Sequence, residues 1–248
     1  MFEKSEKFYD AIYAWKDYKA EAMRLKQFIA ARQRSSGHAF LDVACGTGGH
    51  APYLRDVFTI EGIDINPRML AIARAKHPDI PFHLGDMVDF SVSRQFDVVA
   101  SLFSSIGYLQ SPERLSRAVA NMARHLGPGG VLIVEPFFSP TNWQSSTKAP
   151  GANLVDNEDI KIVRMSDWVR KNNLVKCTFH YLIGTASGVE YFTELHEFTL
   201  FTDDEIRDAF CAAGLDVSYD ATGLMGRGLY MGTWTRETPE IGSEQPRF

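Results

Sequence analysis

Short apolar runs alternate with longer stretches of helical periodicity over residues 15–135. Apolar runs bounded by turn residues are typical of buried strands, whereas apolar side chains spaced three and four apart are typical of helices. The predicted strands are 39–44, 59–64, 80–84, 96–102 and 131–135, and the predicted helices are 15–33, 48–56, 67–76 and 111–126. Because parallel strands need crossover connections, this alternation predicts an α/β fold with a doubly wound, mostly parallel, Rossmann-like sheet.

The pattern changes after the fifth predicted strand. Residues 137–150 are rich in Pro, Ser, Thr and Asn, which is typical of a loop. Residues 159–201 then predict three antiparallel strands, with turns at Lys171-Asn172-Asn173 and Ser187-Gly188. We therefore expect an antiparallel three-stranded insert after the fifth strand, lying above the crevice at the carboxyl ends of the sheet.

The remaining segments return to the main sheet. Thr202 and Glu205 have the spacing of a capping box, which predicts a helix over 202–213. The strands predicted at 215–221 and 228–234 can form a hairpin at one edge of the sheet. We expect one domain over 1–238, which includes a substrate-side insert over 137–201 and is followed by a loose polar tail over 239–248.

Composition and charge narrow the class of protein. The 248 residues carry a formal net charge of −5, without the basic footprint of a nucleic-acid-binding protein. No apolar run reaches the roughly 18 residues of a membrane span, and the first residues lack a signal-peptide core. Three cysteines with no metal-like spacing indicate a reducing compartment. We expect a cytoplasmic protein with no metal, no nucleic-acid partner and no membrane partner.

The sharpest motif is the segment 41–49, Leu-Asp-Val-Ala-Cys-Gly-Thr-Gly-Gly, which follows a predicted strand and precedes a helix. Its glycines allow a tight turn and a close backbone approach to a ligand. Asp64 ends the next strand, 64 − 42 = 22 positions after Asp42, where an acid can bind a ribose hydroxyl or cap the helix at Pro67. Asp86-Met87 follow the third strand, where they can bind adenine or form a turn.

A nicotinamide-dependent oxidoreductase is an alternative, because Ala51 can replace the last glycine of its G-x-G-x-x-G fingerprint. Asp42 argues against that alternative. A carboxylate at the start of the loop repels a pyrophosphate but suits a cofactor that bears an ammonium and a sulfonium.

Residues 39–136 resemble the class I methyltransferases that use S-adenosylmethionine (SAM). The segment Leu41–Gly48 is similar to their first motif, and Asp64, Asp86 and Phe96–Val99 are similar to later ones in order and spacing. The resemblance implies that SAM is the cofactor and S-adenosylhomocysteine the product.

Further stretches resemble the N,N-dimethyltransferases of thymidine-diphosphate-linked amino-deoxysugars in antibiotic-type sugar biosynthesis. They are Tyr9-Asp10, Lys16–Tyr18, Phe103–Leu109, Val134–Phe138, Thr199–Phe201 and Gly226–Leu229. This chain departs from the family pattern at Phe137-Phe138, where two tryptophans are usual, and at Phe2, where a tyrosine is expected.

The two resemblances together imply a set of site residues. The expected cofactor contacts are Tyr9, Tyr18, Asp42, Ala44, Cys45, Gly46, Gly48, Asp64, Ile65, Met69, Asp86, Met87, Ser101 and Leu102. The expected substrate contacts are Ser105, Tyr108, Phe137, Phe138, Arg164 and Arg227, and the resemblance places Tyr108 beside the reacting amine, as the catalytic residue.

Each of the substrate residues also has a purely structural interpretation, in which it does not bind substrate. Ser105 can be a turn residue, and Tyr108 and the two phenylalanines can be core side chains. Arg164 and Arg170 can line a solvated strand face, and Arg227 can be a surface hairpin residue. His180 and His196 in the insert have no metal-ligand pattern.

The expected reaction is an in-line methyl transfer to an unprotonated amine, which the enzyme promotes chiefly by positioning. Tyr108 would orient the amine or accept its proton. The alternatives are methylation of another small molecule at O or N, and a SAM-binding module without catalysis. A homodimer formed through the insert sheet is a further expectation.

Overall fold

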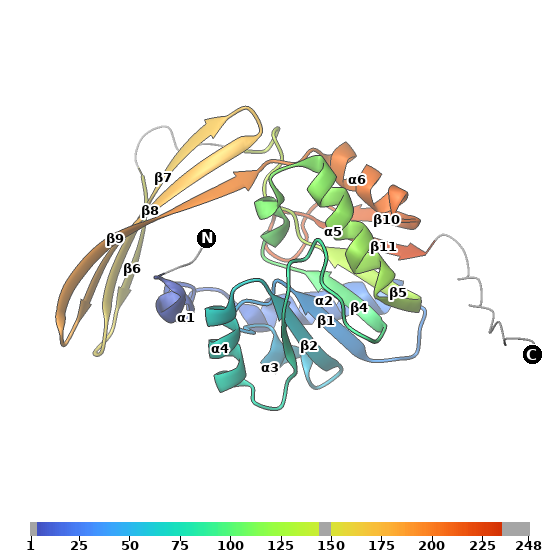
Figure 1. Cartoon of the computed structure of the whole chain (residues 1–248), viewed down its shortest axis with the longest axis horizontal. Helices are drawn as coiled ribbons and strands as arrows, with labels where there is room; N and C mark the ends of the chain where they lie inside the picture. The colour runs from blue at the N-terminus through green and yellow to red at the C-terminus, as the bar shows by residue number, and fades with distance from the viewer. Residues whose placement is uncertain (1–3, 144–149, 235–248) are drawn as a thin grey trace, which may run out of the picture.

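The computed structural model describes residues 4–143 and 150–234. In this part of the chain seven strands form the central sheet: β1 (Ala39–Val43), β2 (Thr59–Asp64), β3 (Phe82–Leu84), β4 (Phe96–Ser101), β5 (Leu126–Val134), β10 (Leu215–Asp220) and β11 (Leu229–Trp234). Their order is β10-β11-β5-β4-β1-β2-β3 (Figure 1). Strands β1 to β5 pair in parallel, and the β10–β11 hairpin is antiparallel at the edge. The doubly wound α/β sheet predicted from the sequence is confirmed.

Helices cover both faces of this sheet. They are α2 (Tyr18–Arg32), α3 (Ala51–Leu54), α4 (Pro67–Lys76), α5 (Pro112–Arg124) and α6 (Asp203–Ala212). Alternate side chains of the inner strands enter two separate apolar cores, so that Phe40 packs with α2, α3 and α4, whereas Leu41 packs with α5 and α6. This two-sided burial explains why the strands are continuous apolar runs in the sequence.

The insert forms a second sheet of four antiparallel strands, in the order β6-β7-β8-β9, and not of three as predicted. They are β6 (Gly151–Asp156), β7 (Lys161–Lys171), β8 (Leu174–Thr185) and β9 (Gly188–Thr199). The prediction missed β6, an edge strand that pairs only with β7 and has no fully buried side chain. Such a strand leaves little hydrophobic signal.

Two other predicted boundaries are wrong. The predicted helix over 48–56 is reduced to the four residues of α3, because Gly48 adopts a positive φ of 73° and remains in a turn. Strand β5 begins at Leu126 and includes the glycines that were expected to end the preceding helix. A Cβ at Gly130 would lie 2.9 Å from the Asp97 carbonyl oxygen, so glycine lets the strand pass close to β4.

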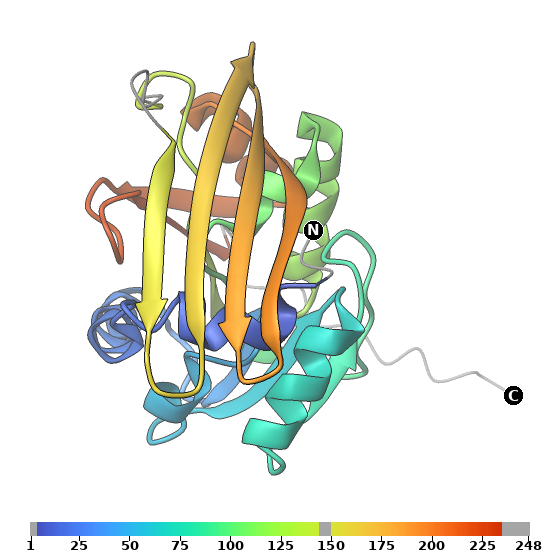
Figure 2. The same cartoon turned by 90° about the vertical axis from the view of Figure 1, so that its left-hand side faces the viewer.

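The four-stranded insert sheet stands over the carboxyl ends of β1 and β4, beside the central sheet (Figures 1 and 2). Its inner face packs on η1 (Glu6–Phe8), α1 (Tyr9–Ile12) and η2 (Ser105–Leu109) through a third apolar cluster rich in aromatic side chains. The N-terminal helices and the insert therefore enclose the crevice where the strand order reverses, which is where open α/β sheets bind ligands. Phe2 and the expected tail over 239–248 lie outside the described residues.

No helix among residues 4–143 and 150–234 is long and apolar enough to cross a membrane.

Candidate active site

Two neighbouring cavities lie in the crevice beneath the insert. The first is lined by the carboxyl end of β1, the Gly-rich loop and helix α2, and has a volume of about 40 Å³. The second, of about 230 Å³, lies between α1, η2 and the inner face of the insert. Tyr9, Phe103 and Ser105 line both cavities, so ligands in the two would share one wall.

The Gly-rich loop forms the floor of the first cavity. Ala44 and Gly46 both have positive φ, 62° and 57°, so the chain turns sharply as it leaves β1. A Cβ on Gly49 would lie 2.6 Å from the ring of Tyr18, which lines the same cavity. The Gly46 amide donates to the Asp64 carboxylate over 2.8 Å, which ties this loop to the end of β2.

Asp42 supplies the carboxyl group that lines the first cavity. Asp42 is 5% exposed. Burial, and to a lesser extent the nearby Asp64, raise the pKa of Asp42 to about 7. A cation bound beside the carboxyl would reverse this shift, since an opposite charge favours the ionised form. The cavity therefore fits a positively charged ligand and disfavours a phosphate.

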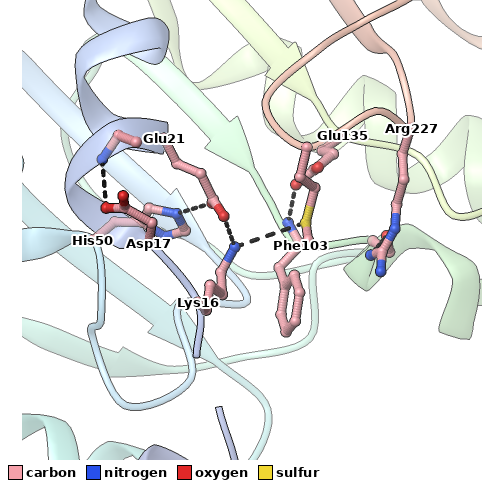
Figure 3. A network of polar contacts seen from close by, with 10 residues as sticks. Lys16, Asp17, Glu21, His50, Phe103, Glu135 and Arg227 are labelled. Carbon is pink, nitrogen blue, oxygen red and sulfur yellow. Dashed lines mark hydrogen bonds and ion pairs between the residues drawn. The ribbon is translucent and has the colours of Figure 1, made fainter. Parts of the chain in front are cut away.

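A buried polar network of Lys16, Glu21 and His50 lies beside the first cavity, which His50 lines (Figure 3). The Lys16 ammonium has no exposed surface, forms an ion pair with Glu21, and lies 4.2 Å from the Phe103 ring centroid. Glu21 also contacts His50 Nε2 at 3.0 Å. Burial lowers the pKa of both Lys16 and His50, and Glu21 partly offsets that effect. The network fixes α2 against the Gly-rich loop and holds Phe103 in place.

The second cavity contains two arginines. The Arg227 guanidinium donates to Ser104 Oγ over 2.7 Å and lies 5.5 Å from the centroids of Phe103 and Phe138. Gly226 and Gly228 on either side have positive φ of 84° and 85°, which the loop needs to direct Arg227 inward. The surface-hairpin interpretation of Arg227 is therefore wrong.

Arg164 reaches the same cavity from β7. Its Nη1 donates to the Tyr13 hydroxyl over 3.0 Å, and its guanidinium lies over the Phe179 ring. The solvated-face interpretation is therefore wrong for Arg164 and holds for Arg170, which is exposed and bonds to main-chain carbonyl oxygens. Phe137, Trp168 and Phe198 form the apolar wall of the cavity. Phe138 packs against Phe137 and Trp143 without lining it.

Tyr108 lines the second cavity from η2. Its hydroxyl lies 2.8 Å from Nδ1 of His196 on β9, and burial raises the pKa of the Tyr108 phenol well above its ordinary value. Tyr108 is therefore a neutral phenol at neutral pH.

The structure brings together part of the predicted cofactor set. Of the cofactor residues, the first cavity is lined by Tyr9, Tyr18, Asp42, Ala44, Cys45, Gly46 and Leu102. The predicted Gly48, Asp64, Ile65, Met69, Asp86, Met87 and Ser101 line neither cavity. Asp86 forms an ion pair with Arg114 at 2.9 Å. The Asp64 carboxylate accepts from the main-chain amides of Gly46 and Asn66. The residue that caps the helix beginning at Pro67 is Asn66, not Asp64.

Several lining residues were not predicted. Thr47, Gly49 and His50 belong to the recognised motif or follow it directly, so their positions could have been extended from it. Tyr13 and Phe103 lie in the stretches that carry the narrower resemblance or between them. His196, which contacts Tyr108 but lines neither cavity, had no sequence signal, because the two residues are 88 positions apart.

Comparison with known proteins agrees with this geometry. Residues 40–130 match the methyltransferase domain family. The chain is 39% identical, over 90% of its length and 95% of the relative, to the dTDP-3-amino-3,4,6-trideoxy-alpha-D-glucopyranose N,N-dimethyltransferase of Streptomyces venezuelae. It is 40% identical, over 90% of its length and 88% of the relative, to the dTDP-3-amino-3,6-dideoxy-alpha-D-glucopyranose N,N-dimethyltransferase of Streptomyces fradiae.

Solved structures show the same similarity. The crystal structure of Streptomyces venezuelae DesVI matches with a TM-score of 0.87 and 37% identity, over 95% of this chain and 100% of that one. SAM-bound CalS10, an amino pentose methyltransferase from Micromonospora echinaspora, matches with a TM-score of 0.82 and 34% identity, over 95% and 98% of the two chains.

The fold, the acidic Gly-rich crevice and these matches define a SAM-dependent methyltransferase. Within that class, the chain belongs to the N,N-dimethyltransferases of dTDP-linked amino-deoxysugars. It is an N-methyltransferase.

Proposed function

We propose that this enzyme transfers methyl groups from SAM to the amino group of a dTDP-linked amino-deoxysugar. The observation that carries the proposal is the pair of adjoining cavities, one acidic and one with two half-buried arginines, separated by Tyr9, Phe103 and Ser105. A cationic methyl donor and an anionic acceptor would each find a complementary cavity, with their reacting ends at the shared wall.

In the first cavity, Asp42 would hold the cationic part of the cofactor, and Tyr9 and Tyr18 would pack against it with their rings. The Gly-rich loop and Asp64 would meet the ribose. Ile65, Met69, Asp86 and Met87, near the ends of β2 and β3, would hold the adenine against the open edge of the crevice. When bound, SAM supplies a methyl group on a positively charged sulfur.

In the second cavity, Arg227 and Arg164 would bind the diphosphate, because a guanidinium can donate two parallel hydrogen bonds to phosphate oxygens. The aromatic wall of Phe137, Trp168 and Phe198 would stack on the thymine, as aromatic side chains do with nucleic-acid bases. The insert would thus form the substrate side of a single domain over 1–238. Tyr108 would orient the sugar amine toward the shared wall, which makes positioning the main contribution of the protein.

The test is mass spectrometry of the enzyme incubated with SAM and a panel of dTDP-linked 3-amino and 4-amino deoxysugars. We expect at least one sugar to gain one or two methyl groups, with S-adenosylhomocysteine formed in the same molar amount as methyl transferred. The corresponding amino sugars without dTDP should react far more slowly, because they lack the group that the arginines bind. Methylation of the free sugars at equal rate would contradict the proposed substrate.

We also propose that the enzyme forms a homodimer through the outer face of the insert. Leu154, Val163, Leu182 and Tyr191 lie in one register row across all four strands, and each is at least 37% exposed. A contiguous apolar row on a sheet face is typical of an interface. Analytical ultracentrifugation should give a dimer for the wild type and a monomer for Leu182→Glu. The matched control Leu84→Glu, at an exposed leucine of the central sheet, should remain dimeric. A monomeric wild type would exclude the interface.

A further inference from the structure

A buried chain of polar groups leads away from the second cavity. The Tyr108 hydroxyl, on η2, lies 2.8 Å from His196 Nδ1 on β9. His196 is 1% exposed, and its Nε2 lies 3.6 Å from an oxygen of Glu194, which is on the same strand and 6% exposed. Because Tyr108 lines the cavity, this chain begins where the proposed acceptor amine would lie.

Glu194 is held in a fixed orientation by the N-terminal segment. Its Oε1 accepts from the main-chain amides of Lys4 and Ser5 over 2.7 and 2.9 Å, and its Oε2 accepts from the Ser5 hydroxyl over 2.6 Å. The oxygen that meets the Ser5 hydroxyl is also the one that faces His196. An oriented carboxylate beside an imidazole stabilises the protonated ring, as in other catalytic His–carboxylate pairs.

The position of Glu194 gives the direction of proton movement. We assign the ring proton of His196 to Nε2, because the Glu194 carboxylate faces that nitrogen at 3.6 Å, and Nδ1 then accepts from the Tyr108 phenol. The lone pairs of the Tyr108 oxygen then remain available to accept a hydrogen bond from the cavity. Burial lowers the pKa of His196 and raises that of Tyr108, so both are neutral at neutral pH.

We propose that Tyr108, His196 and Glu194 form a proton relay that deprotonates the substrate ammonium before methyl transfer; this inference rests on the proposed function. The ammonium N–H bond breaks as an O–H bond forms on Tyr108, while the original phenol proton moves to His196 Nδ1. The products are a neutral amine with a free lone pair, a neutral phenol and an imidazolium that faces Glu194. Tyr108 touches the substrate, whereas His196 and Glu194 act through it as positioning residues.

The relay answers a chemical requirement of the reaction. An aliphatic amine is mostly protonated at neutral pH and must lose a proton before it can attack a methyl group. The same requirement returns after the first transfer, because the methylated product is again an ammonium. Other titratable groups that face the relay are Tyr9 on α1, Tyr13 after α1, Arg164 on β7, and Cys177 and Tyr181 on β8. Arg164 disfavours the imidazolium and Glu194 favours it, so the relay stays uncharged until it takes a proton.

The first test is the pH dependence of kcat/KM for the His196→Asn variant, with dTDP-3-amino-3,6-dideoxyglucose as substrate. The asparagine Oδ1 can replace Nδ1 as the acceptor for Tyr108 but cannot take up a proton. At pH about 7 we expect a loss of about a hundredfold, in the range of general acid–base catalysis. The loss should shrink toward wild-type activity above the pKa of the amine, since the substrate then arrives deprotonated. A loss that is constant across pH would overturn the relay and leave His196 a structural role.

The second test needs no turnover. In the complex with S-adenosylhomocysteine and the same amino sugar, the ¹⁵N shifts of the His196 ring should report a neutral imidazole with its proton on Nε2, so that Nδ1 accepts from Tyr108. In the Tyr108→Phe variant, the Nδ1 shift should move toward that of a ring nitrogen that accepts no hydrogen bond. A ring proton on Nδ1 in the wild-type complex would overturn the relay, because Nδ1 could then not take up the phenol proton. Failure of the wild-type enzyme to methylate any amino sugar would instead refute the proposed function.

Discussion

Replacing Asp42 by Asn should stabilise the fold without cofactor while it weakens SAM binding. Asp42 is buried in the folded protein with a pKa raised from 3.8 to about 7. Between pH about 4 and pH about 7, the folded protein therefore keeps a proton on Asp42 that the unfolded chain releases. The favourable contribution of Asp42 to the unfolding free energy is thus fully present below pH about 4 and is lost as the pH rises to about 7. The difference of roughly 3 pKa units corresponds to about 4 kcal/mol of unfolding free energy above pH 7.

The assay is urea unfolding of the wild type and of Asp42→Asn, without cofactor, at pH 5 and pH 8. Because Asn does not titrate, the stability advantage of the variant should grow between the two pH values by roughly 3 kcal/mol. SAM affinity, measured by calorimetry at pH 8, should fall in the variant, because the cation loses its counter-charge. In the wild type, SAM affinity should decrease as pH falls below about 7, and in the variant it should not. A stability difference that is equal at both pH values would refute the reasoning.

Three further predictions concern other parts of the molecule. Arg227→Ala should raise the KM for a dTDP-amino sugar at least tenfold and leave SAM affinity unchanged, whereas the matched control Arg170→Ala, at an exposed site, should change neither in steady-state kinetics. Tyr108→Phe should lower kcat more than it lowers SAM affinity, and equal losses in kinetics and calorimetry would remove Tyr108 from catalysis. Thr202→Ala should cost about 1 kcal/mol of unfolding free energy in urea with kcat unchanged, because Thr202 and Glu205 form a capping box and line neither cavity.

The central sheet could be predicted from the sequence because its strands are buried on both faces. The observed bounds of β2 and α4 equal the predicted ranges 59–64 and 67–76. The acidic cavity could be predicted for a related reason. Asp42 and the Gly-rich loop are contiguous in the chain, and parallel strands bring their carboxyl ends to one edge of the sheet.

The remaining features of the site and of the insert depend on contacts between segments far apart in the chain, and local sequence patterns do not contain these contacts. Tyr108 and His196 meet only because β9 passes over η2. Arg164 is on an amphipathic strand whose pattern does not say which face meets water, and the structure turns it inward against Phe179. Strand β6 was missed because an edge strand with no buried side chain lacks the regular alternation of apolar and polar residues by which strands are predicted.

The most direct test of the paired cavities is a crystal structure of the enzyme with S-adenosylhomocysteine and a dTDP-amino sugar. The account predicts that the amino-acid end of S-adenosylhomocysteine lies beside Asp42, that the diphosphate contacts Arg227, and that the sugar nitrogen is within hydrogen-bonding distance of the Tyr108 oxygen. A nucleotide sugar bound outside the insert cavity, with its amine remote from the sulfur, would contradict it.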